Sequence, residues 1–445
     1  MIVSSTILKE DVSIVVRENT IDSLLKPFQR FGVHLGLERI KKLLADLDNP
    51  QDRVPIVHVA GTNGKGSVCA YLSSILTEAG YRVGRYTSPH LVDWTERISL
   101  NGQAISEAAL IEILQEIKDA IATDEESPTQ FEVITAAAWL YFARSQVDIA
   151  VIEVGLGGRL DATNVKDDPL VSIITSLSRE HWQRLGPTVA DIAGEKAGVI
   201  KSNRPVVVGQ LPPSAMEVVK AKAEDLNAPL TIVQPATEIK IAATNETTWA
   251  RYQDLEYPLP LLGKVQLSNS AIAVATIKTL QQQGWNIPQL AIQTGINKTR
   301  WLGRLQWTNW HDRPLLIDGA HNPAAAIALR QYVDTLDRPV TWVMGMLSTK
   351  DHEDILEALL KPNDELHFVP VPDHSTAEPK ELAALAIQVC PRLSHCQTHQ
   401  DIFAALDLVM PQCDRDSDRV VVLCGSLYLI GYLFKHGLTP SAALY

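Results

Sequence analysis

The stretch that most constrains the fold of this chain is residues 54–67, which read VPIVHVAGTNGKGS. An apolar, largely β-branched run leads into a glycine-rich turn, and the residues after Ser67 repeat with helical apolar spacing. This order predicts a strand, a phosphate-binding loop and a helix whose positive end faces the phosphate. The strict pattern has a hydroxyl directly after the lysine, whereas Gly66 holds that position here. A glycine-rich turn is also an ordinary link between strand and helix, so a purely structural role stays open.

The length and charge of the chain restrict its class. Its 445 residues exceed what one hydrophobic core usually organises, so we expect two domains. A hydrophobic content of 46% and a charged content of 21% are typical of a soluble globular protein. The net charge of −12 argues against general affinity for nucleic acid or anionic membranes. A local basic pocket for a small anionic substrate remains compatible with it.

The sequence also bears on the compartment. No stretch approaches the ~18 apolar residues of a membrane span, and charges at residues 9–11 interrupt any secretory apolar core. The five cysteines are scattered without paired metal spacing, which is typical of reduced thiols. We therefore expect a cytoplasmic protein, and we expect it to be a monomer.

Apolar spacing divides most of the chain into alternating helices and strands. Helices are expected at 21–47 with an interruption at 31–37, and at 106–122, 131–142 and 268–283. Strands are expected at 54–60, 80–86, 147–153, 171–175 and 206–208. We expect the last of these to close a parallel sheet, with residues 229–260 forming an edge hairpin region.

The pattern restarts near residues 297–303, where we place a domain boundary. Beyond it, expected strands at 315–317, 340–345, 365–371 and 420–424 alternate with helices. They predict a second, smaller α/β unit with a parallel-type sheet.

Polar residues follow several of these strands, at the edge where the phosphate loop opens. Glu153 ends a buried apolar run, which is the usual position of a Mg²⁺ ligand beside a phosphate loop. Thr87 follows the second strand and can supply the hydroxyl that Gly66 lacks. A histidine such as His181 is more often a surface or capping residue, but beside Glu153 it becomes a candidate metal ligand.

Three further features each have two interpretations. Lys196 lies among alanines and glycines, where a lysine is ordinarily solvated, but small neighbours would also let it approach the metal site. Phe131 is either plain core or part of a site. The segment 31–37 is either a packing loop or a substrate flap.

Together the motifs form an ordered set that resembles the folylpolyglutamate synthase/dihydrofolate synthase family of the Mur-ligase superfamily. The set spreads from about residue 34 to residue 430, and its order is far more specific than any single motif. Its members are HVAGTNGKGS at 58–67, TSPH at 87–90, EVGLGGRLDATN at 153–164, GEKAG at 194–198, Gly303-Arg304, DGAHNP at 318–323 and CGS at 424–426.

The resemblance implies a P-loop-type ATPase domain with a parallel sheet at residues 1–298. A smaller Rossmann-like α/β domain on the glutamate side would follow at 299–445, with the active site between the two. The implied reaction is ATP-dependent amide ligation, in which an acyl phosphate forms on a substrate carboxylate and the amino group of L-glutamate attacks it. The implied partners are dihydropteroate, folates, L-glutamate, ATP and Mg²⁺ at two sites, with no nucleic acid or membrane.

The resemblance also implies roles for individual residues. ATP phosphates would be held by Gly61, Thr62, Asn63, Gly64, Lys65, Gly66 and Ser67, and the nucleotide would also be reached by Asn269, Arg304 and Asp318. Mg²⁺ would be ligated by Thr87, Glu153 and His181, and Lys196 would be carbamylated and share a second ion with His181. The pterin would be bound by His34, Leu35, Gly36, Leu37, Thr129, Gln130, Phe131, Glu132, Leu160, Asp161 and Ala162. The catalytic residues would be Lys65, Lys196 and His321.

The chain departs from the family pattern at three places. Many relatives have Asp where this chain has Glu180, a longer carboxylate that we expect still to orient the ring of His181. Val265 replaces a frequent histidine, and residues 370–375 lack a frequent arginine. The last departure leaves the recognition of glutamate open.

Two rival interpretations remain. A peptidoglycan-precursor Mur ligase is less favoured because of Gly36-Leu37, Phe131-Glu132 and the GKGS form of the loop. A regulatory ATP-binding protein without ligase activity is less favoured because the candidate catalytic set is complete. The sequence also leaves open whether the first glutamate is added to dihydropteroate, later ones to folates, or both.

Overall fold

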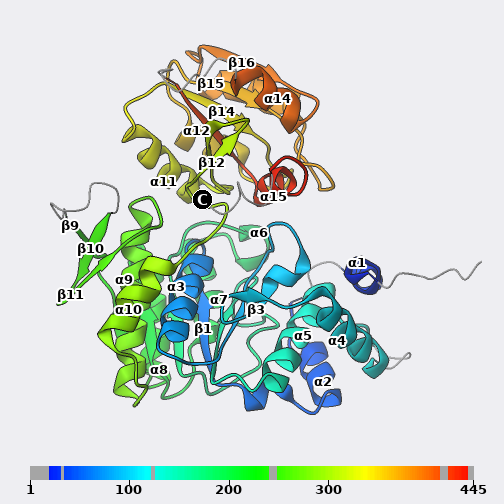
Figure 1. Ribbon diagram of the computed structural model, residues 1–445, viewed down its shortest axis with the longest axis vertical. Helices are drawn as coiled ribbons and strands as arrows, with labels where there is room; N and C mark the ends of the chain where they lie inside the picture. Colours follow the sequence, from blue (N-terminus) through cyan, green and yellow to red (C-terminus); the bar gives the residue numbers. More distant parts are fainter. Residues whose placement is uncertain (1–19, 32–34, 122–125, 240–247, 411–418, 439–445) are drawn as a thin grey trace, which may run out of the picture.

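The computed structural model describes residues 20–31, 35–121, 126–239, 248–410 and 419–438. Its blue-to-green part forms one α/β unit and its yellow-to-red part a second, and the two units are stacked along the long axis of the molecule (Figure 1).

The first unit is built on an eight-stranded sheet with the order β4-β3-β2-β5-β1-β6-β7-β8. The strands β2, β5, β1, β6, β7 and β8 are parallel to one another. The strands β3 and β4 form an antiparallel edge beside β2. Their bounds are β1 Ile56–Ala60, β2 Val83–Tyr86, β3 Ile98–Leu100, β4 Gln103–Ala104, β5 Ile149–Glu153, β6 Val171–Ile174, β7 Val206–Val208 and β8 Leu230–Ile232. Because parallel strands share one direction, the loops after β1, β2, β5 and β6 open at the same edge.

Helices cover both faces of this sheet, which explains the continuous apolar runs of its central strands. One face packs against α3 (Lys65–Glu78), α9 (Val265–Gln282) and α10 (Gln289–Lys298). The other face packs against two groups of helices: α2 (Glu38–Asp46), α4 (Glu107–Ala120) and α5 (Gln130–Arg144) over one half, and α7 (Val189–Lys196) and α8 (Pro213–Asp225) over the other. The central strand β1 is therefore fully buried and holds the following loop rigidly.

The second unit is built on a six-stranded sheet with the order β12-β13-β17-β14-β15-β16. Its strands are β12 Gln306–Trp310, β13 Arg313–Ile317, β14 Val340–Met344, β15 Glu365–Phe368, β16 His395–Thr398 and β17 Val420–Cys424. They alternate with α11 Pro323–Asp334, α12 His352–Leu359, α13 Pro379–Val389, α14 Ile402–Val409 and α15 Leu427–His436. Residues that follow β13, β14 and β17 line one cavity together with residues of the first unit, so the loops after these strands face the first unit.

The structure corrects several expectations from the sequence. The strand at 206–208 does not close the first sheet, because β8 pairs with it in parallel. Residues 229–260 are not one edge hairpin region: β8 belongs to the main sheet, while β9 (Thr237–Ile239), β10 (Trp249–Tyr252) and β11 (Leu255–Pro258) form a separate antiparallel sheet. The second sheet is not wholly parallel, because β12 pairs antiparallel with β13.

The strongly patterned elements are confirmed, including β1, α3, β5 and α9. All strands of the eight-stranded sheet precede α10, and the next strand, β12, belongs to the second sheet. The domain boundary between residues 298 and 299 stays a prediction. Within the described ranges, no helix has the length and apolar character needed to cross a membrane.

Candidate functional site

The loop between β1 and α3 has the backbone shape of a phosphate loop. Gly61 and Gly64 have φ of 146° and 85°, and Gly64 is the N-cap residue directly before α3. The Lys65 ammonium donates to the carbonyl oxygens of Gly61 and Thr62, both at 3.1 Å. The N–H of Thr62 donates to the carbonyl oxygen of Ser176 after β6 (2.7 Å), which fixes the loop against the neighbouring strand. Backbone amides and an ammonium group are thus arranged to bind an anion.

The structure explains why Gly66 stands where a hydroxyl residue is usual. The ring of Trp301, from the segment between the two units, occupies the place that a side chain at residue 66 would need. The guanidinium carbon of Arg85 lies 5.2 Å from the centroid of that ring. Ser67 is buried, and its hydroxyl accepts from Gln266 on α9 (3.4 Å). A side chain at residue 66 would therefore push the interdomain segment away from the loop.

Lys196 is buried, and its ammonium nitrogen lies 2.8 Å from the carbonyl oxygen of Gly61. The same oxygen also accepts from Lys65, so two lysines converge on one backbone atom. Burial, reinforced by the charge of Lys65, lowers the pKa of Lys196 to about 7. Lys196 therefore lies against the phosphate loop and the solvated interpretation is wrong, whereas its approach to a metal ion stays a prediction.

Glu153 and Thr87 are both buried at the ends of adjacent strands. Burial raises the pKa of Glu153, while Lys65 and the Ser88 N–H, which donates at 3.2 Å, act in the opposite direction. A bound cation would relieve this cost. Among the described residues, no group of three His, Cys, Asp or Glu side chains is arranged to hold a metal.

His181 is the third candidate metal ligand. It has a positive φ of 52° and its side chain is about half exposed (45%). Burial of part of the ring is the main cause that lowers its pKa to about 4, so the imidazole is neutral at pH 7 and has a lone pair for a metal.

The expectation that Glu180 orients His181 is not borne out. The Oε1 atom of Glu180 lies 4.0 Å from Nε2 of His181, which is too far for a hydrogen bond. It lies instead 3.2 Å from Nε2 of His321 and 3.1 Å from the amide nitrogen of Asn322, both in the second unit. Burial alone would raise the pKa of Glu180, but His321 and Lys350 hold it well below its ordinary value. Glu180 therefore bridges the two units.

The other candidate nucleotide residues lie around the same loop. Asn269 on α9 packs directly against Gly64. Asp318 accepts N–H bonds from Leu305 and Ala320, each at 2.8 Å, and lies close enough to Arg304 for their charges to interact. Arg304 also interacts with Glu153 and thus faces the first unit. His321 faces Glu180, and its Nδ1 lies 2.7 Å from the carbonyl oxygen of Gly319.

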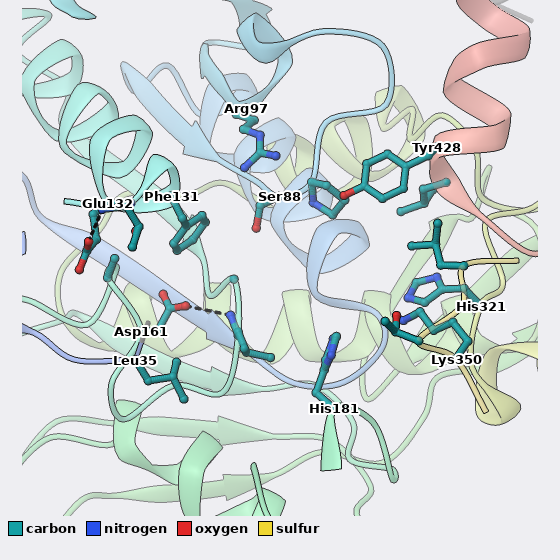
Figure 2. Close-up of a pocket in the computed structure, with 18 of the residues that line it drawn as sticks. Leu35, Ser88, Arg97, Phe131, Glu132, Asp161, His181, His321, Lys350 and Tyr428 are labelled. Atoms are coloured by element: carbon teal, nitrogen blue, oxygen red, sulfur yellow. Dashed lines mark hydrogen bonds between the residues drawn. The ribbon is translucent and has the colours of Figure 1, made fainter. Parts of the chain in front are cut away.

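A cavity of about 400 Å³ opens between the two units (Figure 2). Eight of the predicted pterin residues line it: Leu35, Gly36, Thr129, Phe131, Glu132, Leu160, Asp161 and Ala162. Leu37 and Gln130 are not among the described residues that line it, and His34 lies outside the described residues. His181 and His321 line its other side. The cavity therefore brings most of the predicted pterin residues together with His181 and His321.

Two acids of this cavity also have structural roles. Thr129 and Glu132 form a capping box at the start of α5, and Oε2 of Glu132 also accepts from Arg39 (3.1 Å). Oε1 of Glu132 is buried and finds no donor among the residues that the structure describes. Asp161 caps its own turn: Oδ1 accepts from the Thr163 N–H (3.0 Å) and Oδ2 from the Leu156 N–H (2.8 Å).

Sequence reasoning missed several residues of the cavity. Arg97 is buried in its wall, with its guanidinium carbon 4.5 Å from the centroid of the Trp94 ring and its Nε donating to His90 (3.0 Å). Lys350 and Tyr428 line the cavity from the second unit, where Figure 2 shows them opposite Phe131 and Asp161. Tyr428 lies two residues after the CGS motif, which was the one signal that could have indicated it. The positions of Arg97 and Lys350 depend on folding and docking that no local pattern encodes.

Comparison with known proteins agrees with this geometry. Residues 59–277 match the profile of the Mur ligase middle domain, and residues 304–436 match that of the dihydrofolate synthetase C-terminal domain. The chain is therefore a ligase of the Mur type. It is 33% identical to the Bacillus subtilis dihydrofolate synthase/folylpolyglutamate synthase, over 91% of this chain and 96% of the relative. The Escherichia coli dihydrofolate synthase/folylpolyglutamate synthase is 34% identical, over 93% and 94%.

Solved structures give the same result. Mycobacterium tuberculosis folylpolyglutamate synthase complexed with ADP has a TM-score of 0.84 and 31% identity, over 93% of this chain and 97% of that one. The Escherichia coli FolC protein in complex with DHPP and ADP has a TM-score of 0.80 and 31% identity, over 93% and 95%. The chain belongs to the dihydrofolate synthase/folylpolyglutamate synthase family.

The contact between Gly66 and Trp301 gives a first prediction. Gly66→Ser, which restores the usual loop pattern, should lower the free energy of unfolding by about 1–3 kcal/mol, because the new side chain overlaps the indole ring. Thermal and denaturant unfolding without nucleotide measure this. Gly194→Ala is the matched control, since residue 194 lies in α7 with open space around it and should be neutral or slightly stabilising. Equal stability of the two variants would contradict the packing argument.

Proposed function

We propose that this protein is an ATP-dependent amide ligase that joins L-glutamate to dihydropteroate, and also to the γ-carboxyl group of a folate. The observation that carries the proposal is the cavity between the units, where Phe131 and the buried acids Glu132 and Asp161 line one side and His181 and His321 line the other. Ser88 also lines it and donates to Glu153, whose charge interacts with that of Lys65 in the phosphate loop. The curated relatives from Bacillus subtilis and Escherichia coli carry both activities in their names. The relative from Lacticaseibacillus casei is named folylpolyglutamate synthase alone, which is the alternative.

The chemistry requires activation of a carboxylate, because hydroxide is a poor leaving group. A carboxylate oxygen of the substrate attacks the γ-phosphorus of ATP, the bond to the bridging oxygen breaks, and ADP leaves. The glutamate nitrogen then attacks the acyl carbon, phosphate departs, and the nitrogen loses a proton. Lys65 is placed to stabilise the charge that spreads over the phosphoryl oxygens. Arg304, from the second unit, adds positive charge on the side of Glu153.

Mg²⁺ would be held by Glu153 and Thr87, which are buried at the ends of adjacent strands and offer oxygen ligands, and by the neutral imidazole of His181. When bound, Mg²⁺ neutralises phosphate charge and orients the transferred group. His321 lines the cavity from the second unit, with its Nε2 3.2 Å from Oε1 of Glu180, and we assign it a contact with the substrate.

The pterin side of the proposal is supported by the chemistry of the cavity wall. The ring of Phe131 lies against Gly155 and is tilted 44° to Tyr86, at a centroid distance of 6.3 Å. A flat heteroaromatic ring could stack on it. The free Oε1 of Glu132 and the remaining lone pairs of Asp161 are acceptors, and an amino-pyrimidine edge carries donors.

The domain division and the cellular context also belong to the proposal. We assign the first domain to residues 1–298 and the second to residues 299–445, because Trp301 and Arg304 belong to the segment that joins the sheets. We expect a monomer in the cytoplasm, where the buried thiols of Cys69, Cys390 and Cys424 would stay reduced.

The decisive experiment is ADP release with dihydropteroate or tetrahydrofolate, each with and without L-glutamate. The wild-type protein should release ADP at a substantial rate only when glutamate and one pterin substrate are both present. Lys65→Ala should lower the rate by about 100-fold or more, with an unchanged circular dichroism spectrum. Lys298→Ala is the control, since Lys298 pairs with Glu78 at the surface. ADP release at the same rate with and without each pterin substrate would refute the proposed reaction.

Asp161 tests whether the pterin side discriminates between substrates. Asp161→Ala should depress addition of the first glutamate to dihydropteroate more than extension of a folate that already bears glutamate. The reason is that the shorter substrate depends more on its pterin contacts. The comparison is kcat/KM for each substrate. Asp161 also caps its turn. An equal loss of kcat/KM for both substrates would therefore show that Asp161 has only a structural role and makes no separate contact with the pterin.

Carbamylation of Lys196 is a further part of the proposal. The neutral amine adds to CO₂ and releases a proton, and a lysine with a pKa of about 7 is largely neutral slightly above neutral pH. With ¹³C-bicarbonate, a protein-bound carbamate resonance should therefore grow as the pH rises through about 7, and Lys196→Met should lack it. A wild-type spectrum identical to that of the variant at every pH would show that Lys196 stays unmodified.

A further inference from the structure

Asn322, the N-cap residue of α11, uses every hydrogen-bonding position of its side chain, and three of its four bonds cross to the first unit. Its Oδ1 accepts from the Ala325 N–H (2.9 Å), which caps the helix, and from the side-chain amide of Asn63 (3.2 Å). Its Nδ2 donates to Oδ1 of Asn63 (3.0 Å) and to Oε1 of Glu180 (3.1 Å). A primary amide has two donor hydrogens and two acceptor lone pairs, so the side chain is saturated.

These partners belong to three different loops. Asn63 is part of the phosphate loop after β1, Glu180 follows β6, and Asn322 follows β13 in the second sheet. Asn322 is 3% exposed, so its bonds are shielded from water. The loops of Asn63 and Glu180 are also tied together, because the Thr175 hydroxyl donates to the carbonyl oxygen of Asn63 (2.7 Å). The first unit thus presents one rigid docking surface to one asparagine.

We propose that Asn63, Glu180 and Asn322 form a latch that holds the second unit closed over the phosphate loop. Closure brings His321 and Lys350 to the cavity, brings the charge of Arg304 near Glu153, and keeps water from a hydrolysable intermediate. The latch acts through the position of other groups, so these three are positioning residues in this role. The inference goes beyond the proposed reaction and does not depend on which pterin substrate is used.

The geometry separates a latch from a simple helix cap. Asp is at least as good as Asn at the start of a helix, because its carboxylate accepts the same N–H bond. An aspartate at residue 322 would nevertheless lose both donors and would place a second negative charge beside Glu180. Asn322→Asp should therefore keep α11 and release the latch.

The chain offers a matched control at the start of α14. Asp401 caps that helix by accepting the Ala404 N–H (2.8 Å), away from the space between the units. Asp401→Asn exchanges the same two residue types as Asn322→Asp, in the reverse direction. It should leave the two units as close together as in the wild-type protein. Both variants should unfold at temperatures close to that of the wild-type protein.

The direct readout is small-angle X-ray scattering with AMP-PCP and Mg²⁺. The wild-type protein and Asp401→Asn should have the same radius of gyration, whereas that of Asn322→Asp should be larger. Loss of charge-assisted bonds should also lower kcat/KM for ATP by about tenfold in Asn322→Asp. Scattering requires no turnover, so it reports on the latch even if the proposed reaction were wrong.

Glu180→Gln is the second single variant, and in combination with Asn322→Asp it should restore a hydrogen bond of the latch. The amide that this substitution introduces can donate to an aspartate at residue 322, so the double variant Glu180→Gln/Asn322→Asp should return the radius of gyration toward the wild-type value. Glu180 lies outside any helix cap, so the single variant serves if Asn322→Asp does not fold. It should also open the protein, since it removes the charge that faces His321 and Lys350. Wild-type radii of gyration for both single variants would overturn the latch.

Discussion

Two lysine ammonium groups share one backbone oxygen at the centre of this protein. Lys65 comes from the start of α3 and Lys196 from the end of α7, and both donate to the carbonyl oxygen of Gly61. Two cations this close repel one another strongly where water is excluded. Neutralisation of one lysine, an anion in the loop, or both can offset this repulsion. Glu153 also offsets part of this repulsion, because its charge interacts with that of Lys65. Glu180 instead pairs with His321 of the second unit.

The parts that could be predicted from the sequence are those encoded by short-range patterns. The apolar run before Gly61, the acid at the end of β5 and the helix of α3 depend on spacing within about fifteen residues. The strand β8 was predicted as part of an edge hairpin rather than of the main sheet, because it is short and largely exposed and lacks the apolar signal of its parallel neighbours. The helix α8 was not predicted, and it has only three buried side chains.

The candidate site divides in the same way. The motif residues Leu35, Phe131 and Asp161 could be placed in one region because an ordered set of motifs resembled a known family. Arg97, Lys350 and Tyr428 reach the same cavity only through the docking of one unit on the other. Glu180 shows the limit most clearly: its neighbour in sequence is His181, yet its hydrogen-bond partners lie more than 140 residues away. Adjacency in sequence indicated the wrong partner because the stronger donors come from another domain.

The contact of Trp301 with Gly66 bears on how modular such a protein can be. The indole belongs to the connecting segment, yet it packs against the first turn of the nucleotide-binding helix and lies near Arg85 of the first sheet. Trp301 therefore packs the connector onto the first unit, and the residue at 301 cannot vary independently of the phosphate loop. A chimera that takes its second unit from a relative would have to be joined after residue 301, so that loop and indole are inherited together. Recombination between members of such a family is thus constrained by one steric contact rather than by the boundary between two sheets.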